Sequence, residues 1–583
     1  MGVPRLFPWL VSTFPKAVKR FQEGETTVNV DNLYIDAPSL LHAAAQLVHN
    51  YGTGKRILYP YKNWSAKAKQ TQVCKVFFES IVQVTNIVIP RKVLYIGIDG
   101  PAPFAKMIES RSRRFISARN REQTGDSEAF DSASLTPGTL FMLELTKYVH
   151  TAIRKKIMES GSGWKDINVY FSSPMVPGEG EHKCLTYIRK LPRYVSENES
   201  HCIYGPDGDL IMLALAAHLP NVMLFREDQY SLGYYHLLDM GLVRQGLPKV
   251  LGQLRSIDQE MRSLSEASDD FILAGFFVGN DFLPKIQMFM FLEDGLELML
   301  ATCTRISNGG TGPALTVKGR ISHEGFTRFV EELARREIIY IADQARIPPL
   351  DPRFKNETLL RHMVPPSSPG AKPTLNMGAY RADYYAKSHV DVTSSDEVKN
   401  MCIDYLRSIV WVFRYYVHGL PSWRHHYNYH YAPLMGDLAQ TLARMSSDEF
   451  EDLYTFKQDS PFPQFVQLLL VLPPSSAGLL PKPFHKLLQN PESPLVKNGY
   501  YPKTFKIDFE GKTKEHMGVT LLPYINVDDV FDAYTPINSK LKNTYVRNTI
   551  GRPEMFRYDP DYFASYTSDY GNIDRMQVRK HIL

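Results

Sequence analysis

Two glutamates stand close together on a glycine-containing turn in the stretch PGEGEHK, residues 177–183. Glycine precedes and separates Glu179 and Glu181, and Lys183 follows two residues later. Bringing two like charges together costs free energy unless a cation or a positive surface neutralises them. The stretch therefore indicates a cation site, although an exposed loop would also explain GEGE taken alone.

Five aspartates occupy comparable positions, at the ends of β-rich runs or on turns: Asp36, Asp99, Asp207, Asp209 and Asp281. A single aspartate at such a place is usually a helix N-cap or a turn residue. Seven carboxylates converging on one sheet edge would repel one another, and Mg²⁺ would relieve this because it is hard and prefers oxygen ligands. The set predicts one or two Mg²⁺ ions, with Mn²⁺ as an alternative, that activate water for phosphodiester cleavage.

A basic run follows Asp99 directly and reads GPAPFAKMIESRSRRFISARNR. Its basic residues are Lys106, Arg111, Arg113, Arg114, Arg119 and Arg121, with Glu109 as the only counter-charge. Taken alone, such a run is often a solvated helix face. Beside a carboxylate cluster it predicts a phosphate-anchoring pocket, because the arginine fork suits a terminal phosphate.

The elements that would position these groups alternate between strands and helices. Runs typical of buried strands lie at 28–36, 92–99, 167–172 and 201–204, and helical periodicity lies at about 70–88, 138–159, 181–191 and 210–218. Alternation of this kind predicts an α/β fold with a mostly parallel central sheet flanked by helices. Ligands of such sheets bind beyond the carboxyl ends of the strands, where the aspartates fall.

The domain organisation is expected to be at least twofold, because 583 residues exceed what one hydrophobic core usually supports. A Pro-rich stretch at about 346–373 follows a charged amphipathic helix at 320–345 and is the best boundary. We expect a first unit at 1–345 with the acidic and basic clusters, a linker at 346–373, and a second, mainly helical unit at 374–583.

Composition narrows the class of protein. Hydrophobic residues at 44% and charged residues at 22% are globular values, and a net charge of +5 confines any nucleic-acid surface to a local patch. Five scattered cysteines without a C-x-x-C pair argue against a disulfide framework and a structural zinc site. No signal peptide or membrane-spanning stretch is found, so we expect a soluble intracellular protein.

Long stretches of the sequence resemble the XRN family of 5′→3′ exoribonucleases, a branch of the flap-endonuclease/PIN-like nuclease superfamily. They are GVPRLFPWL, IDAPSLLH, IDGPAPFAKMIESRSRRF, PGEGEHK, GPDGDLIMLAL, DDFILAGFFVGNDFLP, YYVHGLPSWRHHYNYHYAP, PFPQFVQLLLVLPPSSAGLLP and FKIDFEGK. The stretches extend over nearly the whole chain. The resemblance implies a PIN-like nuclease core with a second conserved region enclosing the active site.

The resemblance also implies roles for single residues. The seven carboxylates match the family's metal-binding set, and Lys106, Ser110, Arg113 and Arg114 match the pocket for a 5′-monophosphate. Ser110 stands where the family usually has glutamine, so its hydroxyl has a shorter reach to the phosphate. His42 matches the histidine that stacks on the terminal base, and Trp423 is the expected aromatic partner.

The activity implied by the resemblance is processive, Mg²⁺-dependent hydrolysis of 5′-monophosphorylated single-stranded RNA to nucleoside 5′-monophosphates, in RNA turnover or processing. A monomer acting in the cytoplasm or the nucleus is expected. One alternative is a structure-specific nuclease for DNA flaps, which would share the acidic set. Another is a catalytically silent RNA-binding scaffold, which the presence of all seven carboxylates disfavours.

Overall fold

A computed structural model describes most of the chain, namely residues 5–56, 58–124, 129–253, 263–290, 295–349, 351–366, 368, 372–512, 514–541 and 545–583. The chain forms two compact units, each built from separate segments. We call them the sheet unit (Lys16–Gly241, Ser460–Lys503, Ile525–Leu583) and the helical unit (Met1–Pro15, Leu242–Asp459, Thr504–Tyr524). No helix in the described part of the chain is long and apolar enough to cross a membrane.

These units have other bounds than the expected division at 346–373, which stays a prediction. Residues on both sides of that stretch belong to the helical unit, whereas 460–503 and 525–583 belong to the sheet unit with 16–241. The cause is long-range strand pairing: a strand at Glu554–Tyr558 pairs with one at Asn168–Ser172. Local composition does not reveal such pairing.

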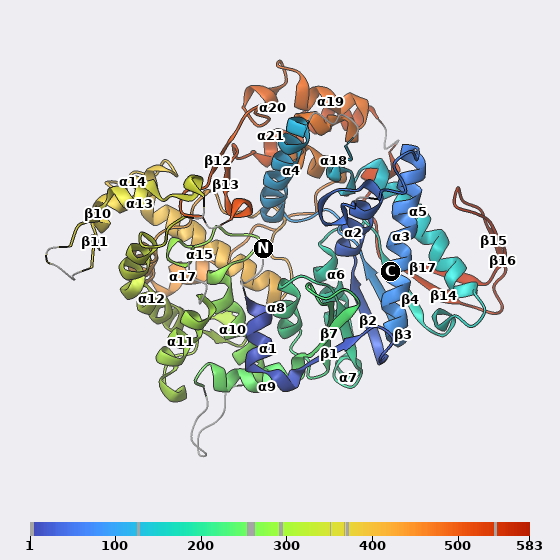
Figure 1. The fold of residues 1–583 in the computed structure, drawn as a ribbon, viewed down its shortest axis with the longest axis horizontal. Helices are drawn as coiled ribbons and strands as arrows, with labels where there is room; N and C mark the ends of the chain where they lie inside the picture. The colour runs from blue at the N-terminus through green and yellow to red at the C-terminus, as the bar shows by residue number, and fades with distance from the viewer. Residues whose placement is uncertain are drawn as a thin grey trace. The chain divides into compact units, whose positions relative to one another are not determined.

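A nine-stranded sheet organises the sheet unit, in the order β1-β7-β6-β5-β2-β3-β4-β14-β17 (Figure 1). Its strands are β1 (Val18–Gln22), β2 (Val28–Asp36), β3 (Val88–Gly97), β4 (Asn168–Ser172), β5 (His201–Tyr204), β6 (Val222–Glu227), β7 (Tyr234–Asp239), β14 (Glu554–Tyr558) and β17 (Val578–Ile582). The five central strands run parallel, and the outer four pair antiparallel. The predicted α/β class with a mostly parallel central sheet is therefore confirmed.

Opposite faces of the central strands pack differently, since successive side chains point to opposite sides. Leu33 and Ile35 of β2 are fully buried in a core shared with α2, α3 and α5. On the other face, Tyr34 and Tyr95 contact Tyr187 of α6, with ring centroids 6.0 Å and 5.1 Å apart. Helices therefore cover both faces, which is what a parallel sheet requires.

Four helices of the sheet unit, α3, α5, α6 and α8, agree closely with the predicted periodicity. The helices of this unit include α2 (Pro38–His49), α3 (Ala66–Ile87), α4 (Phe104–Thr124), α5 (Leu140–Met158), α6 (Gly180–Lys190), α7 (Arg193–Ser196), α8 (Asp209–Ala216), α18 (Gln464–Val471), α19 (Lys482–Gln489), α20 (Pro494–Lys497) and α21 (Val527–Lys540). Side-chain caps fix several starts: Ser65 accepts from Ala68 N and Thr139 from Met142 N.

The segment 460–503 fastens the basic helix α4 within the sheet unit. The Arg111 guanidinium donates to Leu470 O at 3.3 Å and to Tyr500 O. Just before α4, Ala102 N donates to Gln467 Oε1 at 2.8 Å. Arg111 is therefore a buried residue that binds α4 to the segment 460–503. The start of α4 is held to the same segment through Ala102.

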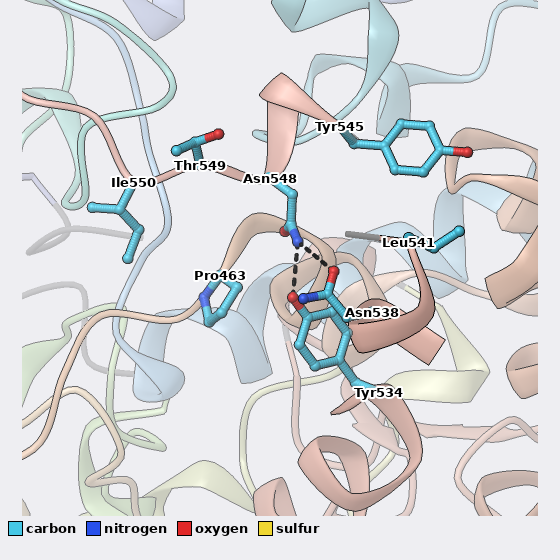
Figure 2. A pocket seen from close by; sticks show the side chains of 8 residues that line it. All are labelled: Pro463, Tyr534, Asn538, Leu541, Tyr545, Asn548, Thr549 and Ile550. Atoms are coloured by element: carbon cyan, nitrogen blue, oxygen red, sulfur yellow. Dashed lines mark hydrogen bonds between the residues drawn. The ribbon is translucent and has the colours of Figure 1, made fainter. Parts of the chain in front are cut away.

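A cavity of about 310 Å³ lies elsewhere in the sheet unit, between α21 and residues 545–550 (Figure 2). Asn548 Nδ2 donates to Tyr534 Oη at 2.8 Å and to Asn538 Oδ1 at 3.3 Å, while Asn548 Oδ1 accepts from Phe465 N. Asn548 thereby ties α21 to α18. None of the predicted site residues lines this cavity.

The helical unit packs around α15, a helix of 23 residues. Its helices include α1 (Leu6–Thr13), α10 (Leu264–Val278), α11 (Gly295–Ser307), α12 (His323–Gln344), α13 (Glu357–Arg361), α14 (Met377–Ala386), α15 (Ser395–Val417), α16 (Met435–Arg444) and α17 (Ser447–Asp452). A further helix, α9 (Met240–Val250), begins at the end of a sheet-unit segment. Short hairpins join Met363–Val364 to Thr374–Leu375 and Lys506–Asp508 to Val519–Leu521. Trp411 of α15 is 1% exposed and donates to Ser422 O.

Candidate active site

The carboxylates of the sheet unit gather because parallel strands end at one edge. Asp36 is the last residue of β2 and pairs with Gly97, the last residue of β3, which in turn pairs with Ser172 at the end of β4. Asp99 follows β3 by two residues, and Asp207 lies on the turn after β5. The predicted convergence of these side chains follows from this register.

The turn PGEGE brings two more carboxylates to the same edge. Glu179 is the N-cap of α6 and Glu181 lies in its first turn. Gly180 N donates to Asp99 Oδ1 at 2.8 Å, and a Cβ on Gly180 would stand 2.5 Å from Asp36 Oδ1. Glycine is needed here because any side chain would displace Asp36, and the helix N-terminus favours the negative charge.

We define the acidic cluster as Asp36, Asp99, Glu179, Glu181, Asp207 and Asp209. Burial and mutual repulsion raise the pKa of four of its members: Asp36, Asp99, Glu181 and Asp209. For Asp36, burial has the largest effect on the pKa, and the charges of Asp99 and Asp207 add to it. These interactions place the six carboxylates in one electrostatic neighbourhood.

Two lysines meet this cluster in different ways. Lys106 Nζ forms an ion pair with Glu179 Oε2 at 3.0 Å, and although burial alone would lower the Lys106 pKa, Glu179 helps to raise it. Lys183 Nζ donates to Ile98 O at 2.6 Å and to Ser173 O at 3.1 Å. Burial lowers the Lys183 pKa to about 7, opposed in part by Asp99. Lys183 thus ties together the chain just beyond β3 and β4.

The residues predicted to bind a 5′-phosphate, namely Lys106, Ser110, Arg113 and Arg114, all lie on α4. Arg114 donates from Nε and Nη2 to Thr136 Oγ1, at 3.1 Å and 2.8 Å, and from Nη1 to Ser110 O at 3.0 Å. Burial and the charge of Arg113 lower the Arg114 pKa to about 10, which leaves it charged at neutral pH. Arg113 is exposed and pairs with Glu109 through Nε at 2.8 Å.

His42 of α2 is in electrostatic contact with these arginines. Its side chain reaches solvent, yet burial by the surrounding protein, together with the charges of Arg113 and Arg114, lowers its pKa to about 4. The imidazole is therefore neutral at pH 7, the form suited to stacking on a base.

Asp281 and Trp423 belong to the helical unit. Asp281 follows α10 on the predicted turn, and Trp423 N donates to Asp459 Oδ1 at 2.7 Å. Their roles beside the acidic cluster remain predictions from the family resemblance. The structure brings together the other residues of the predicted site, all of which are in the sheet unit.

The donor set fits a hard divalent cation, because it consists of carboxylate oxygens whose repulsion a cation would relieve. In the described residues, no three His, Cys, Asp or Glu side chains are arranged to hold a metal ion as they stand. The Lys106–Glu179 ion pair occupies one of the candidate donors. Metal binding would therefore require carboxylate side chains to reorient.

Family models match most of the sequence. The model described as the XRN 5′-3′ exonuclease N-terminus matches residues 1–228, and that of the Xrn1 helical domain matches 262–361 and 372–575. The chain belongs to the XRN family.

Several XRN relatives align along nearly the whole chain. The 5′-3′ exoribonuclease 1 of Homo sapiens is 29% identical over 660 residues, covering 100% of this chain and 37% of the relative. That of Schizosaccharomyces pombe is 28% identical, covering 97% and 51%. The 5′-3′ exoribonuclease 2 homolog of Drosophila melanogaster is 27% identical, covering 94% and 72%. The chain spans about a third to a half of the length of the two exoribonuclease 1 relatives.

Sequence reasoning missed the residues that position the site of this XRN chain. Thr136 holds Arg114, Gln467 holds the start of α4, and Arg111 binds backbone carbonyls instead of facing a ligand. The TPGT turn at 136–139 was the only local signal for Thr136. For Gln467 no local signal existed, because its partner lies far away in the sequence.

Proposed function

We propose that this chain is a 5′→3′ exoribonuclease that removes nucleoside 5′-monophosphates from single-stranded RNA bearing a 5′-monophosphate. The observation that carries the proposal is the acidic cluster at the sheet edge within the same unit as the basic face of α4. The charge of Lys106 opposes the rise in the pKa of Asp36 that burial causes. The pKa of His42 responds to the charges of Arg113, Arg114 and Asp207 as well as to burial, so acidic and basic groups lie close together. The names of the relatives support RNA as the polymer.

The acidic cluster would hold one or two Mg²⁺ ions, through Asp36, Asp99, Glu179, Glu181, Asp207 and Asp209. Such ions, when bound, activate water and neutralise charge on the leaving oxygen. The chain's own contribution is to keep the carboxylates at one edge: the Gly180 N–H orients Asp99, and Lys183 fixes the backbone on which Asp99 stands. Asp281 would complete the set, as the family resemblance implies.

The basic pocket would bind the 5′-monophosphate. Arg114, oriented by Thr136 and Ser110, and the exposed Arg113 would contact its oxygens, and Ser110 Oγ would donate a further hydrogen bond. Lys106 would move between Glu179 and the phosphate. Neutral His42, with Trp423 as its proposed partner, would stack on the first base and place the next phosphorus against the carboxylates.

The test compares hydrolysis of one RNA sequence with monophosphate, triphosphate, capped and hydroxyl 5′ ends, in the presence of Mg²⁺. The monophosphate form should be degraded fastest, and Asp207→Ala should abolish release of nucleoside monophosphates. Equal rates on hydroxyl and monophosphate ends, or full activity of Asp207→Ala, would overturn the proposal. Preference for a DNA flap over single-stranded RNA would favour the structure-specific nuclease instead.

A positioning role for Thr136 gives a finer test. Thr136→Val removes the hydroxyl that accepts from Arg114 at two nitrogens, so the KM for monophosphorylated RNA should rise about tenfold with kcat little changed. Thr136→Ser keeps the hydroxyl and should restore the KM. A fall in kcat alone, or equal damage in both variants, would contradict this role.

A further inference from the structure

The chain that follows α2 is locally basic in a protein that is nearly charge-balanced. Residues 51–78 contain no Asp or Glu, whereas the whole chain has 67 basic and 62 acidic residues. The basic residues are Lys55, Arg56, Lys62, Lys67, Lys69 and Lys75, and the aromatic residues of the loop are Tyr51, Tyr59, Tyr61 and Trp64. A patch of one sign with aromatic residues interleaved is typical of a surface for single-stranded nucleic acid.

This loop is anchored to the C-terminal end of α2. Arg56 N donates to Asn50 Oδ1 at 2.7 Å, and Tyr59 Oη donates to Val48 O at 3.0 Å. Gly54 packs so closely that a Cβ there would stand 2.4 Å from the carbonyl carbon of Gln46. Gly54, Arg56 and Tyr59 are therefore held against α2, and such anchoring lowers the entropy lost on binding.

The aromatic rings form a stepped surface in which Tyr59 and Tyr61 are partly buried and Trp64 is exposed. Tyr59 and Tyr61 have centroids 6.4 Å apart at 78°, and Tyr61 and Trp64 have centroids 5.0 Å apart at 77°. Trp64 is 44% exposed and Leu58 is 85% exposed. A hollow of about 820 Å³ lies beside them, lined by Leu47, Asn50, Arg56, Leu58, Tyr59, Pro60 and Tyr61. A hollow of this size accommodates a nucleotide.

The charges around the hollow are available to a ligand. Lys55, Arg56 and Lys62 are exposed, and in the part of the chain that the structure describes they form no ion pair. By contrast, Lys75 on α3 is 3.8 Å from Glu79. Lys69 Nζ lies 5.4 Å from the centre of the Tyr59 ring. Phosphates are the complementary groups for such exposed cations.

We propose that the aromatic–basic surface formed by Lys55, Arg56, Tyr59, Tyr61, Lys62 and Trp64 is a second binding site for single-stranded RNA, outside the acidic cluster. The choice of RNA over DNA rests on the proposed function. Asp36 precedes α2 and Asn50 follows it, so the two sites stand at opposite ends of a helix about 18 Å long. Lys55, Arg56 and Lys62 contact phosphates, and Tyr61 and Trp64 stack on bases.

The first experiment measures binding without divalent metal, by fluorescence anisotropy of a labelled 5′-hydroxyl oligouridine of about 12 nucleotides. A 5′-hydroxyl end does not engage the phosphate pocket, so this probe reports the second site. In Lys55→Gln/Arg56→Gln/Lys62→Gln, Kd should rise at least about tenfold, and the slope of log Kd against log salt should fall by about 2. The control variant Lys16→Gln/Lys19→Gln/Lys190→Gln removes three exposed charges elsewhere in the sheet unit and should bind normally.

The second experiment separates stacking from charge. Tyr61→Ala/Trp64→Ala should weaken binding about tenfold without changing the salt slope, and Tyr61→Phe/Trp64→Phe should bind normally. Thermal melting of each variant verifies that it is folded. If the charge and aromatic variants both bind like the unaltered protein, the proposal is wrong.

Other partners are outcomes of the same assay. Tighter binding of a poly-glutamate peptide or of phosphatidylserine vesicles than of the oligouridine would overturn the proposal. The outcome for the proposed function is distinguishable from the outcome for the second site. If the unaltered protein has no nuclease activity but binds the oligouridine, and the variants bind it less tightly, the proposed function is wrong and the second site is supported. Cleavage of a monophosphorylated trinucleotide should be unchanged in the variants, since it is too short to reach this surface.

Discussion

Glu337 in the helical unit and Asp36 in the sheet unit are both buried carboxylates, with exposed fractions of 2% and 4%. Glu337 Oε1 and Oε2 accept from Met435 N at 2.6 Å and from Gly436 N at 2.8 Å, at the N-terminus of α16. Asp36 instead faces other carboxylates, whose charges add to burial in raising its pKa. Burial alone therefore does not distinguish these two carboxylates, whereas repulsion from several neighbouring carboxylates does.

The largest expected effect comes from Asp36→Asn. Hydrolysis of monophosphorylated RNA should fall at least about a hundredfold, because a donor to the cation and its charge are lost. The free energy of unfolding without metal should rise by about 1 kcal/mol, because repulsion in the acidic cluster is relieved. Rates and urea denaturation measure the two effects. If Asp36→Asn were less stable than the unaltered protein and fully active, Asp36 would behave as a structural carboxylate like Glu337, and the proposed difference between them would be wrong.

Glu337→Ala should behave in the opposite way. Removal of the carboxylate leaves the buried N–H of Met435 and the partly buried N–H of Gly436 without this acceptor, so the free energy of unfolding should fall by about 2–4 kcal/mol. Urea denaturation measures this loss. The kcat of the protein that remains folded should be unchanged, and a hundredfold loss of kcat would show that Glu337 is also functional.

Two glycines allow a matched test of the carboxylate environments. A Cβ on Gly180 would stand 2.5 Å from Asp36 Oδ1, whereas one on Gly436 would stand 3.3 Å from Glu337 Oε2. Gly180→Ala should therefore lower activity about tenfold and destabilise the protein by about 1–2 kcal/mol. Gly436→Ala should be neutral within about 1 kcal/mol, because better helix propensity offsets the tighter contact. Equal effects in both variants would contradict the close approach of Asp36.

The smallest expected effect is a pH dependence of stability at Glu337. Burial raises its pKa from 4.5 to about 7, against the two backbone donors that lower it. Below pH 4.5 the carboxyl is protonated in both states and its contribution to stability is complete. As the pH rises towards 7 the unfolded chain ionises first, so stability falls, by about 1–3 kcal/mol, and then levels off.

The control for this pH dependence of stability is the variant Glu337→Gln, because glutamine does not ionise. The difference in unfolding free energy between the two proteins, followed by urea denaturation from pH 4 to pH 8, isolates the contribution of this carboxyl. A difference that stays constant with pH, or that changes in the opposite direction, would contradict the raised pKa.

Much of the site could be predicted because its cause is local. Strands 28–36 and 201–204 were predicted with their observed bounds, and residues that follow parallel strands must meet at one edge. The turn at Gly180 likewise follows from the glycines in its own sequence. Such features depend on a few consecutive residues.

The remaining features depend on contacts between distant segments. Thr136 accepts from Arg114, which lies 22 residues earlier in the chain, and Lys183 donates to the carbonyls of Ile98 and Ser173. Neither contact has a spacing that a reader of the sequence would recognise. The pairing of β14 with β4 has no local signal for the same reason, since the two strands are far apart in the sequence.

The late arrival of β14 and β17 has a consequence for synthesis. Until residues 554–582 leave the ribosome, the outer edge of β4 has no strand partner, although β2, β3 and β5 have long been made. A nascent chain that has not yet reached these residues thus carries an open sheet edge, which is prone to pair with strands of other chains. The same order of events means that a product ending before residue 554 would lack two strands of the sheet at whose edge the acidic cluster lies.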